Sequence, residues 1–261
     1  MSKVLDDIKK RAAALGKTIV LPEGEDKRVV KAASDSVKEG IAKIVLLGNE
    51  AEIKADNPDV DLSGVTIIDP LTYEKAEAYA DLLYELRKEK GMTKELAHET
   101  IKKDYTMFGA LMLKAGDVDG MVSGACHSTA NTLRPGLQVI KTAKGTPIVS
   151  AYFLMIAPEC GNKYCEDGCY IYADAGLNQN PTSEQLAYIA QSSAKSAKAI
   201  AGIEPRIAFL SHSTKGSAKH ADVDKVVAAV EKFHEIEPDA LADGELQFDA
   251  AIVPEGGASK A

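Results

Sequence analysis

The chain has 261 residues, of which 45% are hydrophobic and 27% charged, a composition that fits a folded globular protein and excludes a disordered or fibrous one. Its net charge of −8, from 31 basic and 39 acidic residues, opposes binding to the phosphate backbone of nucleic acids. We therefore expect no nucleic-acid partner, although a small anion needs only a local cluster of donors.

The sequence shows no sign of a membrane or export segment. Residues 1–10 lack the apolar core of a signal peptide, and the longest apolar run, 149–157, is far shorter than the roughly 20 residues that span a bilayer. We expect a cytoplasmic protein with no membrane contact and with reduced cysteines. The spacing of Cys160, Cys165 and Cys169 lacks a fourth thiol or a nearby histidine that would complete a tetrahedral site, so we expect no metal.

Short apolar runs alternate with amphipathic stretches along the chain. The runs predict strands at 18–21, 44–47, 65–68, 120–122, 148–156, 170–173, 207–210 and 250–253. The stretches between them predict helices at 26–40, 72–90, 104–115, 182–201 and 217–235. Asp26 is positioned to cap the first of these helices, and Thr182 with Gln185 forms a capping box at another.

This alternation predicts an α/β fold with mainly parallel sheets and helices on both faces. The polar segment 144–147 contains Gly and Pro and suggests a boundary between two domains, 1–145 and 146–261. We expect two α/β domains with a cleft between them.

Two polar segments share one arrangement. The strand at 120–122 runs into 123–129, and the strand at 207–210 runs into 211–217; each segment carries a His-Ser-Thr triplet and has a cation nearby, Arg134 or Lys215. Ligands of open α/β sheets bind at the carboxyl ends of strands, where hydroxyls and helix N–H groups suit a phosphoryl group. The alternative is that these Ser and Thr residues are ordinary helix N-caps.

Other motifs are absent or weak. Segment 213–217 lacks the first Gly of a P-loop, and no GxGxxG follows a strand. His127 and His212 lie beside hydroxyls, yet neighbouring residues rarely adopt the geometry of a nucleophile and its base, and no G-x-S-x-G elbow is present. Arg134 suits bidentate phosphate contact, while Arg87 is also explained as a cation at a helix C-terminus.

Several longer motifs make the chain resemble the phosphate acetyltransferase/butyryltransferase family. They are VLPEG (20–24), DGMVSGA (119–125), STA (128–130), LRPGLQVIKT (133–142), ADAGLN (173–178), SHSTKGSAK (211–219) and DGELQFDAA (243–251). They occur in the family's order, the likeness extends from residue 20 to the last residue, and the acetyl branch is the closer match.

The resemblance implies a homodimer that transfers an acetyl group between coenzyme A and phosphate, with acetyl-CoA, CoA, phosphate and acetyl phosphate as substrates and no other cofactor. By matching, Ser128, Thr129 and Arg134 would bind phosphate on one side of the cleft, and Ser213, Thr214 and Lys215 on the other. Arg87 would contact coenzyme A.

The family's catalytic base, an Asp, and a neighbouring Ser-Arg pair belong to an N-D-L-S-R-G motif that this sequence does not contain. We therefore expect the chain as given to be a shortened form with little or no activity, unless Asp174 or His212 provides the base. Two alternatives stay open: a phosphate butyryltransferase, and a non-catalytic acyl-CoA-sensing domain like the related one in some malic enzymes.

Overall fold

The computed structural model describes residues 3–157 and 168–260. The chain divides into two compact units, an N-terminal unit, Lys9–Lys141, and a C-terminal unit of residues 142–261 together with the first eight residues. This division lies beside the boundary expected at 145. Cys160 and Cys165 lie outside the described residues. Within the described part of the chain, no helix is long and apolar enough to cross a membrane.

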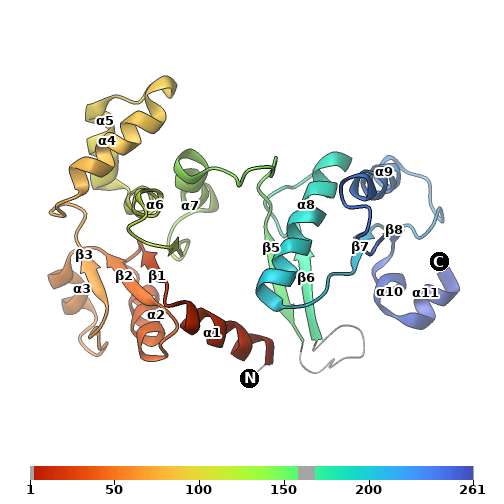
Figure 1. Ribbon diagram of the computed structural model, residues 1–261, viewed down its shortest axis with the longest axis horizontal. Coiled ribbons are helices and arrows are strands. Elements are labelled where there is room, and N and C mark those ends of the chain that lie inside the picture. The colour runs from red at the N-terminus through yellow and green to blue at the C-terminus, as the bar shows by residue number, and fades with distance from the viewer. Residues whose placement is uncertain (1–2, 158–167, 261) are drawn as a thin grey trace. The chain divides into compact units, whose positions relative to one another are not determined.

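The N-terminal unit is built on a parallel four-stranded sheet with the strand order β3-β2-β1-β4 (Figure 1). The strands are β1 (Thr18–Leu21), β2 (Lys43–Leu47), β3 (Thr66–Ile68) and β4 (Gly120–Met121). The α-helices are α1 (Lys3–Leu15), which crosses the boundary between the units, α2 (Lys27–Lys38), α3 (Glu50–Asp56), α4 (Ala76–Arg87), α5 (Lys94–Lys103), α6 (Tyr105–Ala115) and α7 (Thr129–Pro135). Short helical turns, η1 (Lys88–Lys90) and η2 (Gly136–Ile140), extend α4 and α7.

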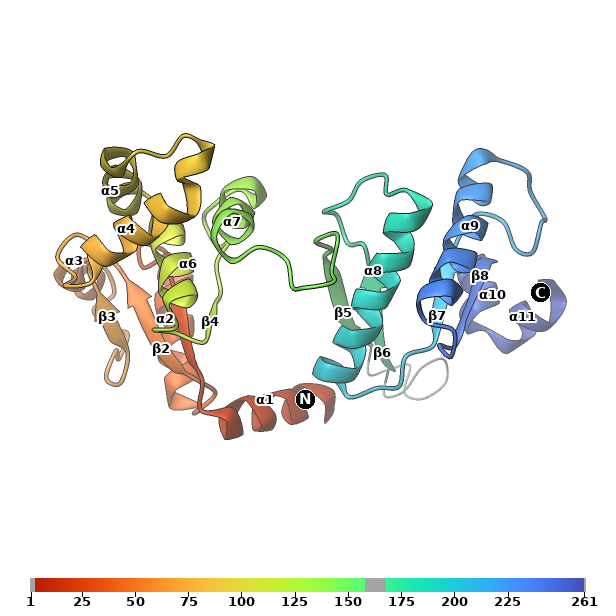
Figure 2. The ribbon, with the colours of Figure 1, turned by 45° about the horizontal axis from the view of Figure 1, so that its top comes forward.

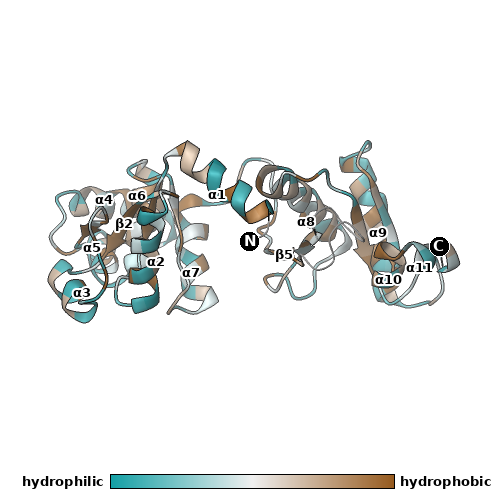
Figure 3. Ribbon diagram, turned by 90° about the horizontal axis from the view of Figure 1, so that it is seen from below, coloured by the Kyte–Doolittle hydropathy of each residue, from teal (hydrophilic) through white to brown (hydrophobic). Residues whose placement is uncertain are grey.

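Helices cover both faces of this sheet, as the sequence predicts. Alternate residues of a strand point to opposite faces. Val20 and Leu47 pack with Phe108 of α6 and other residues of α4 to α6, whereas Leu21 and Leu46 pack with residues of α2 and α3. The strands are brown in Figure 3 and the helices are mixed in colour, as expected for buried strands beneath amphipathic helices. Helix α6 is buried from Thr106 to Met112, which explains its apolar sequence.

The C-terminal unit contains two strand pairs and two long helices (Figure 2). Its strands are β5 (Tyr152–Ile156), β6 (Cys169–Ala173), β7 (Ile207–Leu210) and β8 (Ala242–Leu246). Its helices are α8 (Ser183–Ser196), continued by the turn η5 (Ala197–Ala201), then α9 (Ala221–Ile236), α10 (Phe248–Ile252) and α11 (Pro254–Lys260). Phe209 of β7 and Phe233 of α9 lie in the core of this unit with residues of α8.

Two features of the C-terminal unit differ from the sequence-based expectation. Strands β5 and β6 pair antiparallel, so the parallel arrangement holds for β7 and β8 but not for this hairpin. The prediction of a strand at 250–253 is wrong, because these residues belong to α10 and the segment after it. The strand that pairs with β7 is β8. A four-residue apolar run does not distinguish strand from helix, and β8 contains Asp243, Gly244 and Glu245 instead of an apolar pattern.

We expect Gly24→Ala to destabilise the N-terminal unit. A Cβ at Gly24 would lie 2.2 Å from the carbonyl oxygen of Leu47, so the backbone after β1 would have to shift. Overpacking of this kind costs about 1–3 kcal/mol, which urea unfolding would measure. Gly136→Ala is the matched control: Gly136 has helical φ and no atom within 4 Å of its added Cβ, so this change should be neutral or stabilising. Equal losses from both substitutions would contradict the steric explanation.

Candidate functional site

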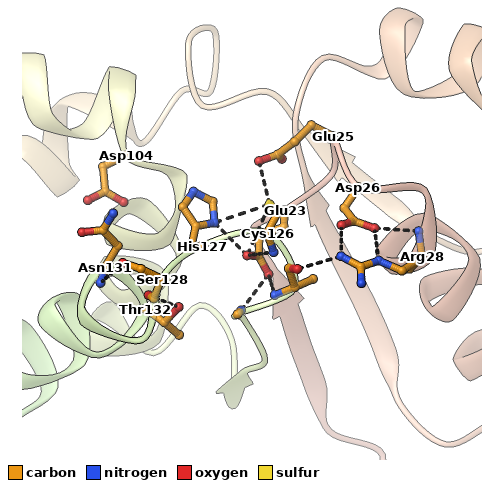
Figure 4. Close-up of polar contacts among 12 residues, drawn as sticks. Glu23, Glu25, Asp26, Arg28, Asp104, Cys126, His127, Ser128, Asn131 and Thr132 are labelled. Atoms are coloured by element: carbon orange, nitrogen blue, oxygen red, sulfur yellow. Dashed lines mark hydrogen bonds and ion pairs between the residues drawn. The ribbon is translucent and has the colours of Figure 1, made fainter.

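The first polar segment is held by the buried carboxylate of Glu23. Glu23 follows β1, and the segment follows β4, the neighbouring parallel strand. Oε2 of Glu23 accepts hydrogen bonds from the N–H groups of Gly124 and Ala125 at 2.8 and 2.9 Å, and Oε1 accepts one from Cys126 N at 3.0 Å. Nδ1 of His127 lies 2.7 Å from Oε1 (Figure 4). With 2% of its side chain exposed, Glu23 fixes four consecutive residues of the segment.

Glu23 and His127 form an ion pair when the imidazole is protonated. Burial raises the pKa of Glu23, but the hydrogen bonds from His127 and from the N–H groups of residues 124–126 outweigh it and lower the pKa to about 2. In turn, the hydrogen bond to Glu23 raises the pKa of His127 above its ordinary value. The His127 side chain is 36% exposed, whereas that of Glu23 is buried, so the pair links a buried carboxylate to an imidazole at the surface of the unit.

Cys126 and its neighbours give no support to a metal or a nucleophile. Burial, followed by Glu25 and Glu23, raises the pKa of the Cys126 thiol to about 12, so it is a poor nucleophile at neutral pH. Ligand atoms of Glu23, Cys126 and His127 lie within 4.8 Å of one another, which is close enough for a cation site. Both oxygens of Glu23 already accept N–H donors, however, so a cation would have to displace bonds that shape the segment.

Three of the predicted phosphate-binding residues lie together in the N-terminal unit. Ser128 is the exposed N-cap of α7, where its Oγ accepts a hydrogen bond from Asn131 N at 3.3 Å. Thr129 and Arg134 are exposed on the same helix. Ser128 therefore serves as a cap and still has a hydroxyl hydrogen to donate. Arg87, the last residue of α4, is partly buried and lies on a different helix.

Arg28 is a neighbour of this segment that the sequence analysis missed. Its guanidinium donates from Nε to Asp26 Oδ1 at 3.0 Å and from Nη2 to Asp26 Oδ2 at 2.6 Å. Nη2 also donates to the carbonyl of Ala125 at 2.7 Å, so α2 and Glu23 hold the same loop through different backbone groups (Figure 4). An Asp and an Arg two residues apart at a helix start are ordinary, and nothing in the sequence marks this contact.

The second polar segment is also held by a buried glutamate. Glu245 lies on β8, beside β7, and Oε1 accepts hydrogen bonds from Ser213 Oγ at 2.8 Å and from Gly216 N at 2.7 Å. The N–H of Gly216 lowers the pKa of Glu245, against the effect of burial. Ser213 Oγ accepts from Ala218 N at 3.0 Å, and Thr214 Oγ1 accepts from Gln247 N at 2.9 Å. Ser213 and Thr214 are 0% and 3% exposed, so both hydroxyls are used inside the unit.

Lys215 is the exposed member of this group. Its φ of 47° lies in the left-handed region, which is uncommon for a residue with a side chain. Its ammonium contacts the carboxylate of Asp243 and donates to the carbonyl of Gly244 at 3.1 Å. The side chains of Lys215 and Asp243 are 41% and 59% exposed, so the pair adds little stability.

Asp174 has the same anchoring role as the two glutamates and is poorly suited to act as a base. Its Oδ1 accepts from the N–H groups of Gly176 and Leu177 at 2.9 and 2.7 Å, and Oδ2 accepts from Asn178 Nδ2 at 2.6 Å. Burial raises its pKa, but the bonds from Asn178 and from backbone N–H groups lower it to about 2. A carboxylate of such low basicity has little affinity for a thiol proton.

The two buried glutamates are the structural feature of these segments that the sequence did not predict. The motifs VLPEG and DGEL each place a Glu beside a Gly, Glu23 with Gly24 and Gly244 with Glu245. A charged residue at or near the end of a buried strand was the available signal. Glu23 follows β1 and Glu245 lies on β8, and each holds the segment that follows the neighbouring parallel strand, so only strand pairing reveals its partner.

Comparison with known proteins identifies the family. A family profile described as phosphate acetyl/butaryl transferase matches residues 3–261. The chain belongs to this family.

Relatives of known name agree with this assignment. The chain is 54% identical over 257 residues to the phosphate acetyltransferase of Acetivibrio thermocellus, covering 98% of this chain and 76% of that protein. It is 49% identical over 253 residues to the phosphate acetyltransferase of Escherichia coli, covering 96% of this chain and 34% of that protein. A solved phosphotransacetylase from Streptococcus pyogenes superposes with a TM-score of 0.90 at 41% identity, covering 100% of this chain and 78% of that one.

Thr214→Val should destabilise the C-terminal unit, because valine keeps the shape of the side chain but leaves the N–H of Gln247 without its acceptor. An unpaired buried donor costs about 1–3 kcal/mol. Thr214→Ser retains the hydroxyl and should recover most of this loss in urea unfolding. If valine and serine had equal effects, the hydrogen bond would not be what holds this loop.

Acid should remove the stabilisation from Glu23. Because its folded pKa of about 2 lies below the ordinary 4.5, the contribution is fully present above pH 4.5 and is lost as the pH falls toward 2. The difference in unfolding free energy between the parent and Glu23→Gln should be about 2 kcal/mol smaller at pH 3 than at pH 6. Urea titrations at both pH values measure it. If this difference in unfolding free energy did not change with pH, the pKa of Glu23 would not be lowered in the folded protein.

Proposed function

We propose that this chain transfers an acetyl group between coenzyme A and phosphate. The observation that carries the proposal is its 54% identity, across 98% of its length, to a protein named phosphate acetyltransferase. Similarity to two solved phosphotransacetylases, with TM-scores of 0.86 and 0.90, supports it.

The reaction needs a base for the thiol, donors for the developing oxyanion and donors for the departing phosphate. The thiolate of coenzyme A attacks the carbonyl carbon of acetyl phosphate, a sulfur–carbon bond forms, and phosphate leaves with the electron pair of the broken carbon–oxygen bond. A thiol of pKa about 8.5 needs a base to take its proton. The developing oxyanion and the departing phosphate need donors. The raised pKa of Cys126 and the lowered pKa of Asp174 argue against either as a catalytic group, and no described residue is assigned as the base.

The exposed predicted residues are the best candidates for substrate contact. Ser128, Thr129 and Arg134 present two hydroxyls and a guanidinium on one loop and helix, which suits a phosphoryl group. Lys215 offers a second cation, and Arg87 is proposed to contact coenzyme A. Ser213 and Thr214 stay predicted phosphate ligands, and direct contact would require their hydroxyls to exchange their present partners. The proposal includes no metal and no cofactor besides coenzyme A as substrate.

Acetyl transfer has two competitors. A phosphate butyryltransferase would carry out the same chemistry with a larger acyl group, and the family description includes both activities. A non-catalytic acyl-CoA-sensing domain would bind the ligands without turnover. The names of the relatives favour the acetyl reaction, and comparing rates with acetyl phosphate and butyryl phosphate, alongside CoA binding, separates the three possibilities.

A homodimer and a cytoplasmic location stay predictions. Phe153 and Met155 on β5 are 59% and 47% exposed, and apolar side chains exposed on one strand are a reason to expect a protein contact. Sedimentation of the parent and of a Phe153→Ser variant would show whether self-association depends on this strand.

Arg134→Ala should reduce kcat/KM for acetyl phosphate by about tenfold or more, because a charge-assisted contact to the phosphoryl group is lost. The assay follows the thioester absorbance of acetyl-CoA formed by the protein as its gene encodes it. Lys102→Ala, which removes an exposed cation from α5, is the control and should leave kcat/KM within about twofold. Unchanged kinetics in Arg134→Ala would exclude Arg134 from phosphate recognition.

A further inference from the structure

We propose that Glu23 is a positioning residue for the phosphoryl group: it fixes the loop 124–127 and holds His127 with one ring nitrogen directed outward to the ligand. The inference rests on the proposed function, because it assumes that the segment beside Ser128 receives a phosphoryl group. Glu23 itself is buried and touches no substrate. It acts through the residues that it holds.

The geometry requires a carboxylate at this position. Each oxygen of Glu23 accepts from backbone N–H groups, Oε2 from Gly124 and Ala125 and Oε1 from Cys126. A glutamine would place an amide NH2 against at least one of these donors, so one group of bonds would be lost whichever way the amide faced. Glu23→Gln therefore keeps the size of the side chain but removes its ability to accept all of these hydrogen bonds.

These hydrogen bonds also decide what remains for a ligand. The N–H groups of residues 124–126 point at Glu23, so these three donors are not available to an anion beside the loop. His127 contacts Glu23 through Nδ1, and Figure 4 shows its other ring nitrogen turned away from Glu23. In the imidazolium form that nitrogen carries a hydrogen, which makes it a free donor on the residue that precedes Ser128 in the chain.

The charge of His127 is important because its surroundings are acidic. Glu23 and Glu25 face it from the segment after β1, Asp104 faces it from the start of α6, and Cys126 lies on its own loop. All three carboxylates favour the imidazolium and would repel an anion. The imidazolium therefore offsets negative charge where the phosphoryl group is proposed to approach, and this effect depends on the bond to Glu23.

The test uses three variants of the protein as its gene encodes it, with inorganic phosphate as the probe. Glu23→Gln breaks the anchor. His127→Gln removes the cation and leaves the bonds to residues 124–126 in place. Glu25→Gln is the matched control, since it removes a nearby exposed carboxylate whose hydrogen-bond partner in the structure is the Cys126 thiol. The measurements are phosphate affinity against pH, amide hydrogen exchange of residues 124–126, and the NMR titration of His127.

Glu23→Gln should weaken phosphate binding by about tenfold or more, speed amide exchange at residues 124–126 and lower the pKa of His127. His127→Gln should weaken binding while the amides stay protected, which a purely structural role of Glu23 would not produce. The ratio of parent to His127→Gln affinity should fall as the pH rises through the pKa of His127. Phosphate ionises identically in both measurements and cancels from this ratio.

Each outcome decides a different point. If the parent binds phosphate and Glu23→Gln, folded, binds it equally well, the positioning role is wrong. If Glu23→Gln does not fold, His127→Gln is the deciding variant, and an unchanged phosphate affinity in that variant overturns the inference. A parent that binds no phosphate overturns the proposed function, and the inference with it. Loss of affinity in Glu25→Gln equal to that in Glu23→Gln would show a general charge effect instead of positioning.

Discussion

A buried carboxylate that accepts backbone N–H groups is the interaction on which both polar segments depend. As whole residues, Glu23 is 1% exposed and Glu245 is 4% exposed. Burying a charge without partners is costly. Each glutamate offsets that cost with hydrogen bonds from the segment that follows the adjacent parallel strand. The bonds keep the carboxylates ionised and give each loop a defined shape.

Glycines make these positions possible. A Cβ at Gly24 would meet the carbonyl of Leu47, and a Cβ at Gly244 would lie 2.7 Å from Cβ of Phe209. In each unit the glycine beside the glutamate permits close approach of a neighbouring strand. The Glu and Gly of VLPEG and DGEL therefore act as pairs, one residue allowing strands to approach and the other anchoring a loop.

This way of building a loop has a chemical consequence. In many phosphate sites backbone N–H groups bind the anion directly. Here Glu23 accepts the N–H groups of Gly124 and Ala125, and the phosphate contacts proposed beside that loop are side chains, Arg134 and the hydroxyl of Ser128.

The sequence alone determined the class of fold, the family and most elements of the N-terminal unit. Hydrophobic periodicity and the caps at Asp26 and Thr182 are local signals, and the structure confirms both caps. The motifs were equally local, and they located the two polar segments correctly at the carboxyl ends of β4 and β7.

Only the tertiary structure decided what those segments do inside each unit. Glu23 and its partner Gly124 are 101 residues apart in the sequence, and no spacing rule connects them. The same holds for the hydrogen bond from Ser213 to Glu245, for the contact of Arg28 with Ala125 and for the antiparallel pairing of β5 with β6. Local patterns fix elements because they depend on neighbours in the chain, whereas hydrogen-bond partners depend on which strands come to lie side by side.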